Sequence, residues 1–226
     1  MPRARTSTQD YQQTASTETG SGCLSLFSLP ILAVFVITCL ITALSLSTPV
    51  TISASPQINS TNSISPIFTK EVQYWAGNIT RWADASSLDP NLIATVMQIE
   101  SCGDPRALSP AGAMGLFQVM PYHFSGSDAP YNPDTNALRG LAYLEESLST
   151  HQNIRLALAG YNGGIGTAGK PESQWPSETI RYAYWGIGIF QNAQSGEEVS
   201  ERLEEWYHAG GASLCHQAEQ RLGISP

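Results

Sequence analysis

The sequence has few charged residues, and they leave a long gap. Among its 226 residues, 11 are Lys or Arg and 19 are Asp or Glu, which gives a net charge of -8. We do not expect a nucleic-acid partner, because neutralising phosphates requires clusters of Lys and Arg that this chain lacks. Between Glu18 and Lys70 there is no charged residue at all. This gap separates a short N-terminal tail from the rest of the chain.

The sequence also lacks the cysteine and histidine spacing of a metal site. Its 4 Cys and 4 His residues never fall at the intervals typical of metal ligands, so we predict no metal and no cofactor. Cys23 and Cys39 lie inside the uncharged gap, which leaves Cys102 and Cys215 in the remainder. Outside the cell these two can form a disulfide, and the alternative is two small buried thiols.

An apolar run lies inside the gap. Residues 23–46 are apolar apart from a few Ser and Thr, and a helix of this length spans the ~30 Å hydrocarbon core of a membrane. Signal peptides have shorter apolar regions, of ~7–15 residues, so we predict an uncleaved transmembrane signal anchor. Two Arg precede the run and no cation follows it until Lys70, which favours a cytoplasmic tail over residues 1–22. The remainder is then extracytoplasmic on a single-pass membrane protein; cleavage and secretion is the alternative.

Two segments follow the apolar run. Residues 47–66 are rich in Ser, Thr, Pro and Asn without charge, which predicts a flexible linker. After Pro66 the apolar residues recur at helical spacing, and strand-like alternation is absent. We therefore predict an all-α domain over residues 67–226, with a C-terminal helical extension.

One helix of this domain is well marked by its ends. Asp89 is typical of an N-cap, Pro90 of the first helical position, and Gly103 lies just past the predicted end. Further helices are predicted at residues 115–120, 135–148, 154–161, from 177 onward, at 197–208 and around 214–222.

The helix predicted over residues 197–208 is amphipathic. Val199, Leu203 and Trp206 are expected to face inward, and the intervening Glu residues to face solvent.

Glu100 is the first candidate for catalysis. It ends an apolar helix beside Ile99 and precedes a Ser-Cys-Gly turn, a setting that raises the pKa of a carboxylate. A Glu that stays protonated near neutral pH can donate a proton to a glycosidic oxygen and then act as a base. On its own, a Glu at a helix end is more often a surface residue.

Four short segments, in order along the chain, favour a catalytic role for Glu100 over a surface position. They are IES at residues 99–101, SPAGAMGLFQVMP at 109–121, AGYNGG at 159–164 and ETIRY at 178–182. They resemble the Glu-Ser pair, the Gly-Leu-x-Gln-x-Met-Pro segment, the Ala-Tyr-Asn-x-Gly turn and the Glu-Thr-x-x-Tyr block of the soluble lytic murein transglycosylase family. Gly160 departs from this pattern, standing where the family has alanine. Each segment alone could be a turn, a cap or a core aromatic; four in register favour the family.

The resemblance implies a lysozyme-like (goose-type) fold and a function in cleaving the glycan strands of peptidoglycan. Glu100 would be the only acid and base. Enzymes of the family let the sugar's own 6-hydroxyl attack, which leaves 1,6-anhydromuramoyl ends. Tyr182 falls where a hydroxyl lies near the catalytic carboxyl, and we count it among the substrate-binding residues. The residues that fall where the family contacts the saccharide are Ser109, Gln118, Met120, Tyr161 and Asn162.

Two other functions stay open, as does the oligomeric state. A goose-type lysozyme would use water, and a hydrolase with two carboxylates needs the second ~5–9 Å from Glu100. Asp104 is the only acidic residue close by in sequence, and we expect it to cap a loop. The third possibility is a non-catalytic peptidoglycan-binding module, which would not need the acid. We expect a disulfide between Cys102 and Cys215 to hold the segment carrying Glu100 against the last helix.

Overall fold

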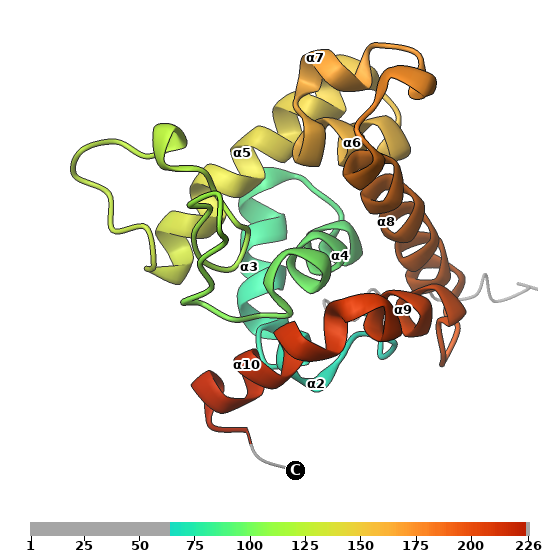
Figure 1. Cartoon of the computed structure of the whole chain (residues 1–226). Helices are drawn as coiled ribbons and strands as arrows, with labels where there is room; N and C mark the ends of the chain where they lie inside the picture. The colour runs from blue at the N-terminus through green and yellow to red at the C-terminus, as the bar shows by residue number, and fades with distance from the viewer. Residues whose placement is uncertain (1–63, 225–226) are drawn as a thin grey trace, which may run out of the picture. The chain divides into compact units, whose positions relative to one another are not determined.

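The computed structural model describes residues 64–224, and this part of the chain is helical (Figure 1). The prediction of an all-α domain is confirmed here: no strand occurs among the described residues, only two isolated β-bridges, from Met114 to Leu108 and to Val119. The predicted tail, apolar run and most of the linker lie outside the described residues. Within residues 64–224, none of the helices has the length and apolar character needed to span a membrane.

Helix α4 (Pro90–Ser101) is the buried centre of the domain. The side chain of Asp89 caps it by accepting a hydrogen bond of 2.8 Å from the backbone N–H of Asn91, and Pro90 lies in the first turn, as the sequence predicts. All residues from Leu92 to Ile99 are buried, the polar Thr95 and Gln98 included, so the helix is covered on all sides. Four helices contact it: α2 (Lys70–Gln73), α3 (Ala76–Ser86), α8 (Ser177–Ser195) and α10 (Ala212–Leu222).

A second group of helices packs beside this centre. Helix α6 (Ile154–Gly163) contacts α5 (Pro133–His151), α7 (Ile165–Ala168) and α8. A small apolar cluster joins α6, α7 and α8 and consists of Ala159, Ala168, Trp175 and Ala183. The remaining short elements are η1 (Pro121–His123), η2 (Glu172–Gln174), α9 (Glu201–Trp206) and η3 (Tyr207–Gly211).

The helix predicted over residues 115–120 is wrong. Both Gly115 and Gln118 have left-handed backbone conformations, with φ of 74° and 45°, which a helix cannot contain. The buried side chain of Asn136, from α5, accepts a hydrogen bond from the N–H of Phe117 (2.9 Å) and donates one to the carbonyl of Met114 (2.8 Å). These contacts replace the hydrogen bonds of a helix, so the segment folds as tight turns.

The helix predicted over residues 197–208 begins later than expected. Ser200 is its N-cap and accepts a hydrogen bond of 3.1 Å from the N–H of Leu203. Leu203 and Trp206 are buried as predicted, but Val199 precedes the cap and is 72% exposed. The expected inward orientation of Val199 is wrong, because the helical period does not extend to it.

The packed domain includes two residues that the sequence assigned to the linker. Ile64 and Ser65 are both buried. The N–H of Ser65 donates to the side-chain oxygen of Asn91 (2.7 Å), and its carbonyl accepts from the side chain of Gln73 (2.7 Å). Residues 64 and 65 are therefore held against α2 and the start of α4.

Candidate active site

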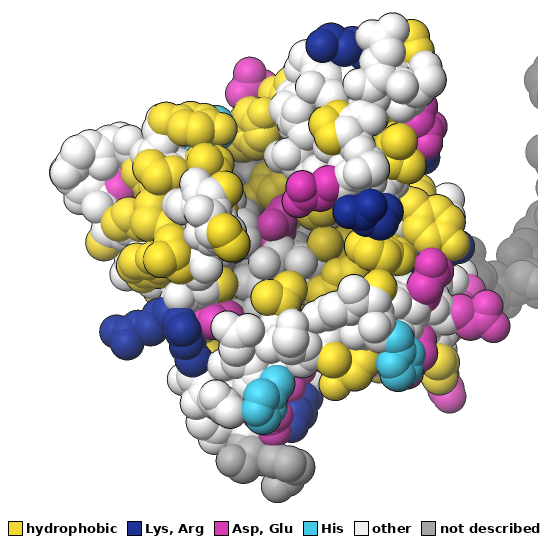
Figure 2. Space-filling model, viewed as in Figure 1, with side chains coloured by type: hydrophobic (Ala, Val, Ile, Leu, Met, Phe, Trp, Pro, Cys, Tyr) yellow, Lys and Arg dark blue, Asp and Glu magenta, His cyan; other side chains and the backbone are white. Residues whose placement is uncertain are grey.

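Glu100, in the last turn of α4, lines a pocket of about 390 Å³. Figure 2 shows this face of the molecule with a hollow at its middle, where acidic side chains lie among hydrophobic ones. Of the six residues predicted to bind the substrate, Tyr182 does not line this pocket. The other five do: Ser109, Gln118, Met120, Tyr161 and Asn162. Segments far apart in the sequence therefore converge on Glu100.

The environment of Glu100 raises its pKa from 4.5 to about 8. Burial is the main cause, because the charged form loses its hydration. The hydroxyl of Tyr182 acts in the opposite direction, and the negative charge of Glu178 raises the pKa further. The carboxyl is therefore protonated at neutral pH, the form that a general acid needs.

Tyr182, from α8, is buried and does not line the pocket. Its hydroxyl has no hydrogen bond of good geometry within residues 64–224, yet it is close enough to Glu100 to lower the pKa of that carboxyl. Burial and the nearby Glu100 raise the pKa of the phenol in turn. The hydroxyl therefore lies close to the carboxyl of Glu100 without forming an ideal hydrogen bond.

Ser101 fixes the turns of residues 115–120 against the end of α4. Its hydroxyl donates to the carbonyl of Leu116 (2.7 Å) and accepts from the N–H of Gly103 (3.1 Å). The side chain of Gln118 donates to the carbonyl of Gly115 (3.0 Å) within the same turn. The polar groups beside Glu100 are therefore preorganised by short-range hydrogen bonds.

Tyr161 and Asn162, at the end of α6, are also held in place. The hydroxyl of Tyr161 donates to the carbonyl of Phe117 (2.7 Å). The hydroxyl of Thr179, on α8, donates to the amide oxygen of Asn162 (2.9 Å), which sets the orientation of that amide. Helices α6 and α8 approach so closely here that a Cβ on Gly163 would lie 2.5 Å from the Thr179 hydroxyl.

Two acidic residues, Asp104 and Glu178, could assist Glu100, and only Glu178 lines the pocket. Asp104 caps a loop: it accepts from the N–H of Arg106 (2.8 Å), lies 3.5 Å from Arg221 and does not line the pocket. Glu178 does line it. The sequence contained a signal for this position, because Glu178 lies four residues before Tyr182 and so on the same face of α8.

Several other pocket residues were not predicted from the sequence. Tyr122 and His123 come from η1, and Arg139, Gly140 and Tyr143 from one face of α5. Helical spacing predicts that residues 139 and 143 share a face, but it does not say that this face borders the pocket. Nothing in the sequence pattern distinguished them from other partly exposed residues.

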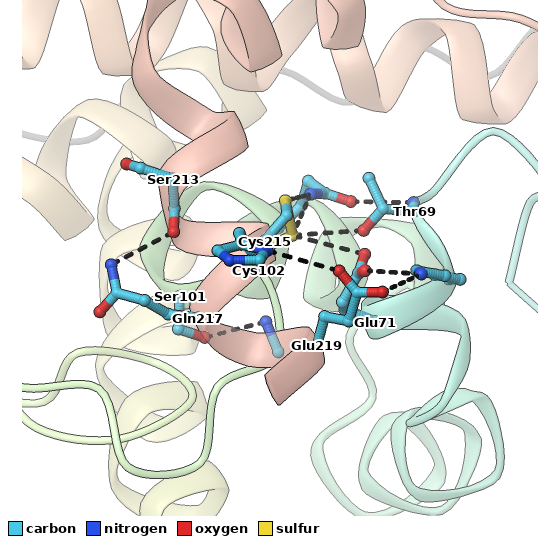
Figure 3. Close-up of a disulfide and its surroundings, with 12 residues drawn as sticks. Thr69, Glu71, Ser101, Cys102, Ser213, Cys215, Gln217 and Glu219 are labelled. Carbon is cyan, nitrogen blue, oxygen red and sulfur yellow. Dashed lines mark hydrogen bonds and ion pairs between the residues drawn. A yellow bond between two sulfur atoms is a disulfide. The ribbon is translucent and has the colours of Figure 1, made fainter. Parts of the chain in front are cut away.

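A disulfide joins Cys102 and Cys215, and thus the end of α4 to α10 (Figure 3). The buried side chain of Gln98 donates toward both sulfurs, at 3.1 and 3.7 Å, while its oxygen accepts from the N–H of Thr69 (3.1 Å). The carboxylate of Glu71 lies beside the sulfurs. Since both sulfurs are bonded to each other, this cluster offers a metal no thiolate.

Comparison with known proteins gives a consistent picture. Residues 77–183 match the family described as the Transglycosylase SLT domain, and this range contains all four segments singled out in the sequence. The transglycosylase of Enterobacteria phage PRD1 is 40% identical over 98 residues, which are 42% of this chain and 35% of the phage protein. Membrane-bound lytic murein transglycosylase C of Actinobacillus succinogenes is 34% identical over 115 residues, 41% of this chain and 32% of that protein. The chain spans about a third of the length of these relatives.

A solved structure is also similar. It is the lytic transglycosylase Slt of Pseudomonas aeruginosa, determined as an inactive mutant and 25% identical in sequence to this chain. The similarity covers 66% of this chain and 24% of that one, with a TM-score of 0.38.

Proposed function

We propose that this chain is a lytic transglycosylase, because residues 77–183 match the Transglycosylase SLT domain. Its substrate is the glycan strand of peptidoglycan, cleaved at the β-1,4 bond between N-acetylmuramic acid and N-acetylglucosamine. The observation that carries the proposal is the setting of Glu100, a carboxyl with a pKa of about 8 in a pocket large enough for part of a saccharide.

Two proton transfers by Glu100 account for the reaction. The protonated carboxyl first donates its proton to the glycosidic oxygen, so that the bond from this oxygen to the anomeric carbon of the muramic acid breaks. The carboxylate then accepts the proton of the 6-hydroxyl of the same sugar as that oxygen bonds to the anomeric carbon. The products are a free N-acetylglucosamine hydroxyl and a 1,6-anhydromuramoyl end, and Glu100 is again protonated.

The fixed polar groups of the pocket suit the binding part of this proposal. The amide of Asn162, oriented by Thr179, and the side chain of Gln118 can hydrogen-bond sugar hydroxyl and N-acetyl groups. The ring of Tyr161 offers an aromatic face to a sugar ring. Ser109 and Met120 complete the wall of the pocket that Glu100 also lines. Since these groups are already held in place, little ordering is required on binding.

We also propose a goose-type lysozyme-like fold for the domain and a location outside the cytoplasm, anchored to the cell membrane. A goose-type lysozyme-like arrangement of the helices fits a buried central helix that ends in the catalytic carboxylate. The apolar run at residues 23–46 supports a single-pass anchor in the cell membrane with the domain outside the cytoplasm. A disulfide in the domain fits an oxidising compartment.

One observation favours a second function, a hydrolytic muramidase. Glu178 lines the pocket together with Glu100, and its charge raises the pKa of Glu100. A second carboxylate at this place could activate a water to attack the anomeric carbon instead of the 6-hydroxyl. The product would then have a reducing end and contain one water more.

The mass of the products separates these functions. Purified full-length protein is incubated with peptidoglycan, and the released fragments are weighed by mass spectrometry. Anhydro fragments support the transglycosylase, reducing fragments the muramidase, and binding without any fragment a non-catalytic module.

A further inference from the structure

Four aromatic rings form a continuous row along the pocket. Tyr122 and His123 come from η1, Tyr143 from α5 and Tyr161 from α6. The centroids of successive rings in this row lie 4.6, 4.7 and 5.9 Å apart. All four residues line the pocket that contains Glu100. The aromatic row therefore belongs to the same cavity as the catalytic carboxyl.

The two ends of the aromatic row differ in exposure. At the inner end, Tyr161 is hydrogen-bonded to the carbonyl of Phe117, and it is close enough to Glu100 that the carboxylate raises the pKa of its phenol, after burial as the main cause. At the outer end, the side chain of Tyr122 is 76% exposed. The row thus leads from Glu100 to the molecular surface.

The loop that follows η1 is tied to α5. The guanidinium of Arg139 donates to the carboxylate of Asp128 and to the hydroxyl of Ser125, both at 2.7 Å. The N–H of Ser125 donates to the same carboxylate (2.8 Å). Because Ser125 follows η1 by two residues, these bonds limit the movement of Tyr122 and His123. A ligand that stacks on them meets a preorganised surface.

We propose that Tyr122, His123 and Tyr143 form an additional sugar-binding subsite, which holds an N-acetylhexosamine ring of the glycan strand farther from the cleaved bond. The C–H face of a pyranose ring is apolar and packs on aromatic rings, while hydroxyl groups at its edge need polar partners. Arg139 lies along the same wall and offers such a partner. The choice of ligand rests on the proposed function. None of the three residues belongs to the saccharide contacts predicted from the sequence.

The test measures how affinity depends on the length of the ligand. N-Acetylglucosamine oligomers of increasing length, from the dimer to the hexamer, are titrated into the full-length Glu100→Gln protein by calorimetry. The same titration is run with three variants of this parent protein, which carry Tyr122→Ala, Tyr122→Phe or Tyr131→Ala in addition to Glu100→Gln. Tyr131 is the matched control, because it is an exposed tyrosine on the same loop that does not line the pocket.

We expect affinity to increase with length in the parent protein. Tyr122→Ala should weaken binding of the longest oligomers about 3- to 10-fold and leave the dimer unchanged, because only a long oligomer reaches the outer end of the row. Tyr122→Phe and Tyr131→Ala should bind like the parent. Unchanged thermal unfolding of Tyr122→Ala is expected, since the residue is on the surface.

Three results would overturn the subsite: no binding of any oligomer, affinity in the parent that does not depend on length, or a Tyr122→Ala effect that is absent or equal at every length. Its failure is distinguishable from failure of the proposed function. A length effect that depends on Tyr122, together with a wild-type chain that releases no fragment, would retain the subsite and reject the enzyme. If the wild-type chain releases fragments but Tyr122 has no effect on the dependence on length, the enzyme is retained and the subsite is rejected.

Discussion

Cys102, two residues after Glu100, is joined by a disulfide to Cys215 of α10, with the two Cα atoms 4.9 Å apart. The link closes a loop of 113 residues around most of the domain. In the chain-entropy account, a loop of this size restricts the unfolded chain more than the folded one. We therefore expect the Cys102→Ala/Cys215→Ala double variant to lose about 2–5 kcal/mol of unfolding free energy in urea. Equal stability of this variant and the oxidised wild type would contradict the prediction, as would mass mapping that finds both thiols free.

The hydroxyl of Ser147 occupies the space that a side chain on Gly160 would need. This hydroxyl is buried and donates to the carbonyl of Ala157 (2.9 Å). Gly160→Ala should therefore overpack the contact between α5 and α6 and cost about 1–3 kcal/mol. In the Ser147→Ala background the added methyl has room, so the double variant should be more stable than the sum of the two single changes predicts. A double-mutant cycle in urea measures this coupling, and strict additivity would reject it.

Glu178→Gln should move the pH profile of activity to lower pH. Glu100 acts as an acid only while protonated, so kcat/KM falls as pH rises through its pKa of about 8. The charge of Glu178 raises that pKa, and removing the charge lets Glu100 lose its proton at lower pH. Glu198→Gln, an exposed residue outside the pocket, is the matched control and should leave the profile unchanged. An alkaline limb that stays in place in Glu178→Gln would contradict this electrostatic coupling.

Tyr182→Phe should move the same limb in the opposite direction. The Tyr182 hydroxyl lowers the pKa of Glu100, so removing it raises that pKa and extends activity to higher pH. The hydroxyl has no hydrogen bond of good geometry among the described residues, and its loss should change the unfolding free energy by less than about 1 kcal/mol. The measurement is kcat/KM against pH for both proteins, with a thermal unfolding curve for each. A limb that moves to lower pH would refute the assigned role.

The ends of α4 could be predicted from the sequence because their signals are local. Asp89, Pro90 and Gly103 mark the limits of the helix through backbone preferences that hold in any fold. The segment at residues 115–120 could not be predicted in this way. Its conformation depends on Asn136, which is distant in sequence and satisfies the backbone groups of the turn. Tertiary hydrogen bonds here override the local pattern.

The same distinction holds for the candidate site. Glu100, Gln118, Tyr161 and Asn162 were found because they lie in segments that resemble a known family, and the structure brings them to one pocket. The aromatic row could not be found in this way. The rings of η1 meet those of α5 and α6 only because of how η1 packs. The closeness of Glu100 and Glu178 could not be predicted either, because it depends on how α4 and α8 cross.

In the proposed reaction Glu100 alone carries the proton, and water takes no part. Its most direct test is the mass of the fragments released from peptidoglycan by the full-length wild type and by Glu100→Gln. We expect 1,6-anhydro fragments, lighter by one water than hydrolysis products, and a rate for Glu100→Gln lower by about 100-fold or more. Fragments that all carry reducing ends, or equal release by Glu100→Gln, would contradict it.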